Sequence, residues 1–211
     1  MIKELSHFII DFDDNNKDVV YICSQLKNKS NEITNFFDLK NVKVNVKIFD
    51  DLDEFRNLIK KHARHLLENG SVPLWICGVS INSNIYTLTL SEYQRTKSHQ
   101  NDTLDDLIKL IMHEFTHACF QKINNQRSYA WLSEGLATTL SHQYDNKNCS
   151  FDATLEDIID GTPNYANYYL MFKYVLSTYG KEYILKLINN KELLENETPK
   201  LYNETINHYR S

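Results

Sequence analysis

The stretch LIMHEFTHACF, residues 110–120, constrains this chain more than any other part of its sequence. It is apolar on almost every face of a helix, yet it carries His113, Glu114 and His117. Burying unpaired imidazoles and a carboxylate is costly, because each loses its hydrogen bonds to water or has to give up its charge. A helix of this composition therefore predicts a partner that satisfies all three polar groups.

The helix that carries these residues has a predicted start and a predicted buried face. Thr103 and Asp106 form a capping-box pattern, which is typical of a helix N-terminus. One apolar stripe follows at helical spacing, and it comprises Leu104, Leu107, Ile108, Ile111, Phe115, Ala118 and Cys119. His113 and His117 lie off that stripe, so we expect them to face a site instead of the core.

A divalent metal ion is the partner that the spacing favours. His113 and His117 are one turn apart, about 6 Å along the helix axis, so both rings can point at one atom. Glu114 lies about 100° round the helix from His113 and flanks that atom. The pattern is HExxH, in which two histidines bind zinc and the glutamate is a general base. The alternative is two satisfied core histidines with a surface glutamate.

Glu134 is the predicted third ligand. It lies in WLSEGLATTL, with sixteen residues between His117 and Glu134. The polar loop 124–128 ends the first helix, and a second, antiparallel helix would bring Glu134 to the histidines. Gly135 and Ala137 are small enough to let helices pack closely. One zinc ion held by two histidines and a glutamate keeps a fourth position for water, as a catalytic site requires.

The paired motifs resemble those of a known enzyme family. HExxH followed by W-L-x-E-G-x-A is similar to the gluzincin metallopeptidases, most of all to the aminopeptidase N branch and to peptidase MA-like domains. The resemblance implies that His113, His117 and Glu134 bind zinc and that Glu114 is the general base. Thr138 stands where thermolysin-type enzymes have an aspartate, and the aminopeptidase N branch has a longer spacing between its second histidine and its glutamate.

The resemblance also implies a tyrosine that stabilises the oxyanion. The segment NYANYYLMFKYVLSTYGKEYILKLI, residues 164–188, is similar to the helix that follows the ligand glutamate in the family. An ungapped comparison assigns the family's tyrosine to Tyr165, and Tyr168 is the alternative. A third possibility is that these tyrosines form an aromatic face in the core.

The segment GVSIN, residues 78–82, predicts that the enzyme is not an aminopeptidase. Enzymes of the aminopeptidase N branch carry G-x-M-E-N before HExxH, and its glutamate binds the free amine of the substrate. Gly78 and Asn82 match the ends of that pattern, but Ile81 stands in place of the glutamate. An ammonium group leaving water needs a carboxylate partner, which isoleucine does not offer.

The remaining pattern predicts an α+β fold in a single domain, residues 1–211, and the resemblance implies that this fold is zincin-like. Strands are expected at 7–12, 42–49, 72–81 and 84–90, helices at 16–37 and 50–68, and mainly helix after residue 100. We therefore expect an α/β lobe over about 1–100, with a small mixed sheet, and a helical lobe over about 101–211. An edge strand at 74–81 or 85–90 could hold an extended peptide.

Composition narrows the partners and the compartment. The net charge is −5 and no run of Lys or Arg occurs, so nucleic acid and anionic membranes are not expected partners. No apolar run is long enough to span a bilayer. Four dispersed cysteines without a CxxC pattern indicate reduced thiols in a cytoplasmic protein. The sequence leaves the oligomeric state open.

The sequence thus predicts a zinc metallopeptidase that acts on a peptide or protein substrate. The alternative is a non-catalytic binding or regulatory protein that zinc stabilises. Trp131 is expected to pack beneath the site without touching substrate. The other histidines show no ligand spacing with the site and are expected at the surface; these are His7, His62, His65, His99, His142 and His208.

Overall fold

The computed structural model describes residues 1–124, 128–162 and 164–210. The chain divides into two compact units, residues 1–119 and residues 120–211. Helices and a mixed sheet together confirm the α+β class. Residues 125–127 of the predicted loop 124–128 lie outside the described residues.

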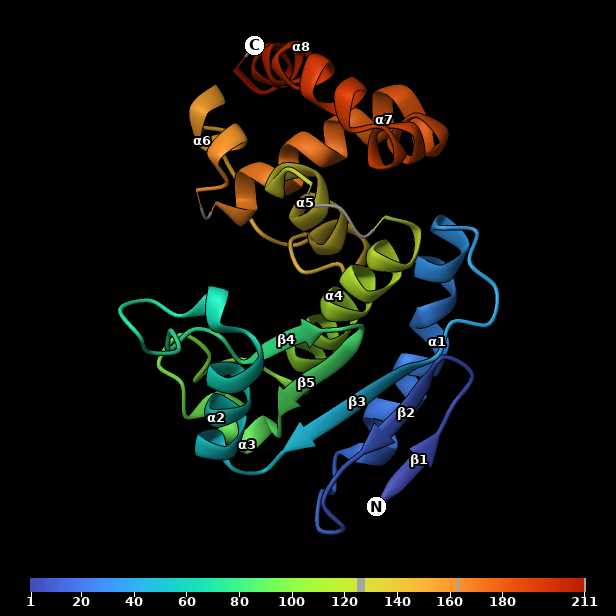
Figure 1. Ribbon diagram of the computed structural model, residues 1–211, viewed down its shortest axis with the longest axis vertical. Helices are drawn as coiled ribbons and strands as arrows, with labels where there is room; N and C mark the ends of the chain where they lie inside the picture. Colours follow the sequence, from blue (N-terminus) through green and yellow to red (C-terminus); the bar gives the residue numbers. More distant parts are fainter. Residues whose placement is uncertain (125–127, 163, 211) are drawn as a thin grey trace. The chain divides into compact units, whose positions relative to one another are not determined.

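The first unit is built on a five-stranded sheet with the order β1-β2-β3-β5-β4 (Figure 1). Its strands are β1 (Ile2–Glu4), β2 (Phe8–Asp11), β3 (Val44–Phe49), β4 (Gly78–Ile81) and β5 (Asn84–Leu88). The three inner strands are parallel, whereas β1 and β4 run antiparallel to their neighbours and form the two edges. Asn82 and Ser83 both have positive φ, which suits a tight hairpin turn between β4 and β5.

Five helical segments accompany this sheet. They are α1 (Val19–Phe36), α2 (Leu52–His62), the short 3-10 helix η1 (Arg64–Leu66), α3 (Leu90–Gln94) and α4 (Leu104–Ile123). Helix α2 has an acidic start, in which the Asp51 carboxylate accepts the backbone N–H groups of Asp53 and Glu54. Such a cap satisfies donors that the first turn of a helix leaves unpaired.

Helix α4 has a capped start and packs against two strands of the sheet close to its histidines. Its capping box is confirmed, since Thr103 N–H donates to Asp106 at 2.9 Å and Asp106 N–H donates to the Thr103 hydroxyl at 3.4 Å. Phe115 packs on Phe8 of β2 with ring centroids 4.6 Å apart. On β4, a Cβ at Gly78 would lie 2.8 Å from the Leu110 side chain. Glycine therefore lets this strand approach α4 closely.

Three expectations about the first unit need correction. The strand expected at 72–81 covers only Gly78–Ile81. Pro73 has no N–H to donate to a neighbouring strand. It begins a turn instead, in which the Ile76 N–H donates to the Pro73 carbonyl at 3.2 Å. The sequence does not predict strand β1, because its three residues include Lys3 and Glu4 and are too few to show the apolar–polar alternation of a strand. His7 and His99, expected at the surface, are partly buried.

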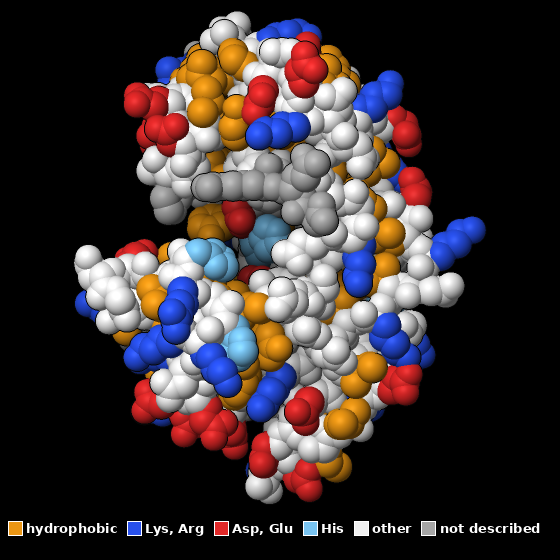
Figure 2. Space-filling view, viewed as in Figure 1, with side chains coloured by type: hydrophobic (Ala, Val, Ile, Leu, Met, Phe, Trp, Pro, Cys, Tyr) orange, Lys and Arg blue, Asp and Glu red, His pale blue; other side chains and the backbone are white. Residues whose placement is uncertain are grey.

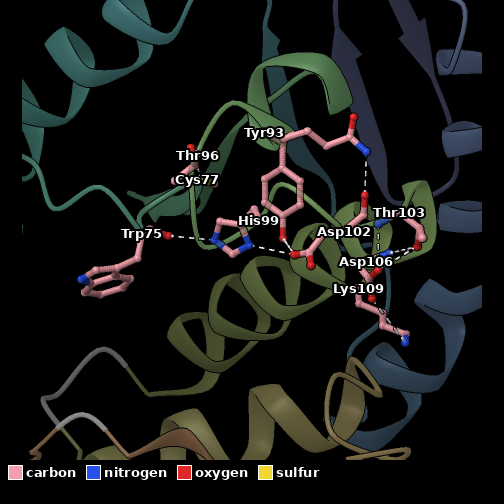
Figure 3. A network of polar contacts seen from close by, with 10 residues as sticks. Trp75, Cys77, Tyr93, Thr96, His99, Asp102, Thr103, Asp106 and Lys109 are labelled. Carbon is pink, nitrogen blue, oxygen red and sulfur yellow. Dashed lines mark hydrogen bonds and ion pairs between the residues drawn. The ribbon is translucent and has the colours of Figure 1, made fainter.

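His99 lies in a polar network that joins α3, the start of α4 and the segment before β4 (Figure 3). Its Nδ1 faces the Asp102 carboxylate at 2.8 Å, and its Nε2 faces the Trp75 carbonyl at 3.2 Å. The ring stacks on Tyr93, whose hydroxyl donates to Asp102 at 3.0 Å. Both imidazole nitrogens meet acceptors, and only a protonated imidazole donates from both.

Electrostatics agree with that protonation state. Burial by itself lowers the pKa of His99, but hydrogen bonds with Cys77 and Asp102 outweigh it and raise the pKa to about 9. Burial and the Asp102 charge raise the pKa of the Tyr93 hydroxyl far above its usual value. Tyr93 therefore stays a donor, and His99 is a cation at neutral pH.

The second unit is helical. It contains α5 (Ala130–Leu140), α6 (Leu155–Asp160), α7 (Tyr165–Asn189) and α8 (Lys191–Arg210). Trp131 of α5 is fully buried and donates its indole N–H to Thr198 of α8 at 3.2 Å, so it packs within the second unit. That it lies beneath the site stays a prediction. The side chain of Asn164 caps the start of α7 by accepting the Asn167 N–H.

Three further observations concern surface charge, the cysteines and the hydropathy of the helices. Figure 2 shows Lys and Arg side chains interspersed with Asp and Glu on the face in view. All four cysteines are free thiols. Within the described parts of the chain, no helix has both the length and the apolar character needed to cross a membrane.

We predict that His99 makes the stability of the protein depend on pH. Its pKa of about 9 in the folded state exceeds the value of about 6.5 expected in an unfolded chain. The contribution of His99 is therefore complete below about pH 6.5 and is lost as the pH rises through about 9. Denaturant unfolding of wild type and His99→Gln should show a larger fall in the free energy of unfolding for wild type over this range.

The exposed His65 offers a matched control. His65→Gln should follow the wild-type curve, because that side chain is exposed to water in the folded chain. Parallel curves for wild type and His99→Gln would contradict the protonated network.

Candidate metal centre

His113 and His117 stand one turn apart on α4 with their rings converging. Their Nε2 atoms are 3.0 Å apart, and the ring centroids are 4.7 Å apart. Two nitrogen ligands of one tetrahedral zinc ion lie about 3.3 Å from each other. His113 is 6% exposed. The pair is thus close to the spacing that a shared metal ion requires, on a helix that holds it mostly out of water.

Glu114 follows His113 directly and is also nearly enclosed, with 8% of the residue exposed. Its neighbours Met112 and Phe115 are fully buried. The hydroxyl of Thr116 donates to the Met112 carbonyl at 2.9 Å, which satisfies that polar group within the helix. The Glu114 carboxylate is therefore mostly removed from water, and electrostatic interactions are stronger there than in bulk water.

Glu134 is carried by a helix whose backbone is held tightly. A Cβ at Gly135 would lie 2.5 Å from the backbone oxygen of Tyr168, so only glycine permits this approach of α5 to α7. The Thr138 hydroxyl donates to the Glu134 carbonyl at 2.7 Å. Thr138 thus stabilises the helix turn of Glu134 through the backbone.

The ligand atoms of His113, His117 and Glu134 all lie within 4.8 Å of one another. Among the residues described, this is the only group of three or more His, Cys, Asp and Glu side chains with metal-ligand spacing. The group has two imidazole nitrogens and one carboxylate oxygen, which is a donor set that zinc accepts. These three residues could therefore hold a metal ion, as the sequence predicts; that the ion is zinc stays a prediction.

The two candidate tyrosines have different surroundings. Tyr165 is the first residue of α7 and is partly buried. Tyr168 is 2% exposed, and its hydroxyl donates to the Thr162 carbonyl. Burial and the Glu134 charge raise the pKa of Tyr168 to about 12. The nearness of Tyr168 to Glu134 depends on how α5 packs on α7, which no motif in the sequence signals.

Comparisons with known proteins give no further assignment. No family model, no curated protein and no solved structure matches this chain. What the site does must therefore be argued from its own residues.

We predict about one equivalent of zinc per chain in protein purified without chelators, since a site of this kind holds one ion. Glu134→Ala should weaken zinc binding strongly, because two imidazoles alone hold the ion poorly. Elemental analysis and a competitive chelator titration measure both quantities.

A matched control is Glu182→Ala, which removes an exposed carboxylate from α7. This variant should keep wild-type zinc content and affinity. Full affinity in Glu134→Ala would show that Glu134 is not a ligand.

Proposed function

We propose that this protein is a zinc-dependent metallopeptidase that cleaves internal peptide bonds, with a zincin-like arrangement of its site. The observation that carries the proposal is the nearly buried Glu114 beside His113, within a helix whose two histidines and Glu134 could hold a metal ion. Structural zinc sites close the ion with four protein ligands, whereas three leave a position for water or substrate. A purely structural site has no need of Glu114.

The residues divide the reaction between them. Zinc, when bound, supplies a Lewis acid that polarises the substrate carbonyl and makes water more acidic. Glu114 takes a proton from the water that attacks the carbonyl carbon. It then passes this proton to the amine nitrogen as the carbon–nitrogen bond breaks. The products are a carboxylic acid and an amine, so atoms and protons balance.

The position of strand β4 in the sheet favours the proposal, because an edge strand can bind an extended peptide substrate. Strand β4 is an edge of the sheet and pairs with β5 on one side. An extended peptide can add to such an edge through backbone hydrogen bonds. Gly78 of β4 approaches Leu110 of α4, and Leu110 precedes His113 by three residues, about 4.5 Å of helix. A peptide bound on β4 would therefore lie near the histidines.

Two further features bear on the substrate and on the location of the proposed enzyme. Ile81, the last residue of β4, offers no carboxylate for a free amine, so we infer that the enzyme does not require a free N-terminus. The free thiols of the four cysteines suit a reducing compartment, and we infer a cytoplasmic location from them.

We predict that Glu114→Gln keeps the fold and the zinc but lowers peptide turnover by about two to four decades. The amide has nearly the same shape as the carboxylate and cannot accept the proton. Turnover of a peptide library by zinc-loaded wild type and variant, with each peptide both free and acetylated at its N-terminus, measures the effect. Acetylated peptides should be cleaved as well as free ones.

Glu182→Gln serves as the control and should keep wild-type turnover. Near-normal cleavage by Glu114→Gln would rule out this mechanism. Zinc-loaded wild type that cleaves no peptide would instead favour a non-catalytic, zinc-stabilised binding protein. A strong preference for free N-termini would show that another acid anchors the amine.

We predict that Tyr165→Phe lowers kcat about a hundredfold with little change in KM, as expected for a donor to the oxyanion. Tyr168→Phe should instead destabilise the fold by about 1 kcal/mol, because the Thr162 carbonyl loses its donor. Steady-state kinetics and thermal unfolding of both variants distinguish the roles. A kcat effect in Tyr168→Phe alone would assign the role of donor to Tyr168.

A further inference from the structure

The turn before β4 exposes two large apolar side chains that follow each other in the sequence. Leu74 is 66% exposed and Trp75 is 47% exposed. The residues on either side of the turn are buried, with Val72 and Ile76 each 6% exposed. The turn is therefore anchored in the core at both ends, while Leu74 and Trp75 between them remain exposed to water.

The backbone of this turn is held by the His99 network. The Trp75 carbonyl accepts from His99 Nε2 at 3.2 Å, and Asp102 holds the other ring nitrogen at 2.8 Å. Beyond the turn, the Cys77 carbonyl accepts from the buried Thr87 hydroxyl at 3.1 Å. Figure 3 shows the indole of Trp75 pointing away from this network. The network thus fixes where the indole is presented without covering it.

A fixed and exposed aromatic side chain is suited to binding. Covering a large apolar side chain is favourable because apolar surface leaves water, and a backbone that is already ordered loses little entropy on binding. Two other exposed aromatic side chains differ, because their hydroxyls are engaged in the fold. Tyr21 donates to Asp105 at 3.2 Å, and Tyr209 donates to the Leu170 carbonyl at 3.4 Å.

We propose that Leu74 and Trp75 form an apolar subsite that selects substrate peptides with a bulky aliphatic or aromatic side chain. The inference rests on the proposed function, because it takes β4 as the edge that holds the peptide. Trp75 precedes Gly78 by three residues, and three residues of chain span at most about 10 Å, so the turn lies beside the start of β4. A peptide that runs along β4 and past its first residue meets this pair within a few residues of the bond cleaved.

The two tryptophans of the chain provide a reporter that does not need turnover. Trp131 is fully buried, whereas Trp75 is exposed, so a change in indole emission on adding peptide reports on Trp75. The protein tested is Glu114→Gln, with and without added zinc, which keeps the peptide intact. The probes are acetylated octapeptides of serine and glutamine that carry one leucine or phenylalanine at each position in turn.

We expect peptides with leucine or phenylalanine at one or two adjacent positions to bind about tenfold more tightly than the all-polar peptide. Their binding should shift the emission to the blue. Anisotropy of labelled peptides should show that Trp75→Ser loses this preference. Val20→Ser, which removes a side chain that is 71% exposed on α1, should keep it.

Equal affinity for apolar and polar peptides at every position would overturn the subsite, as would a preference that survives in Trp75→Ser. Cleavage measured in parallel distinguishes the two proposals. Glu114-dependent cleavage of apolar and polar peptides alike would leave the peptidase intact and remove the subsite. A Trp75-dependent preference in a protein that cleaves nothing would keep the subsite and remove the peptidase.

Discussion

The burial of ionisable groups on α4 is the constraint on which the rest of the structure depends. His113 and Glu114 are 6% and 8% exposed, and such groups are stable only where charges or hydrogen-bond partners replace water. The 3.0 Å approach of the two imidazole nitrogens is explained if both bind one ion. An apolar helix would be easier to bury, so the sequence keeps these groups at a cost in stability that a function has to justify.

Contacts with the sheet and a capped N-terminus fix the position of α4 in the first unit. Phe8 and Gly78 belong to different strands, and both contact α4 within six residues of its sequence, at Phe115 and Leu110. The capping box at Thr103 fixes where the helix begins. Asp102, one residue earlier, ties that start to His99 and the segment before β4. Ligand side chains on a rigid helix hold their geometry better than those on a loop.

The sequence predicted those parts of the fold and site where a local pattern has one physical reading. The alternation of Val42 to Phe49 predicted β3, and HExxH with Glu134 predicted a group that could hold a metal ion. Prediction failed where tertiary contacts decide. Residues 72–77 are apolar enough for a strand, but they form a turn that begins at Pro73. The hydrogen bond between His99 and the Trp75 carbonyl stabilises this turn. His99 looked like a surface residue, since its partners Trp75 and Asp102 meet it only in the folded chain.

In the proposed enzyme, chemistry and recognition rest on different parts of the fold. Backbone hydrogen bonds to an edge strand hold almost any extended peptide, because every residue offers the same N–H and C=O groups. Selectivity then has to come from side chains beside the strand, and a contact with an apolar pocket discriminates about tenfold or more. The turn at Leu74 and Trp75 is attached to β4 through the chain and to α4 through His99 and Asp102. It can therefore change sequence, and with it preference, without moving His113, Glu114 or His117.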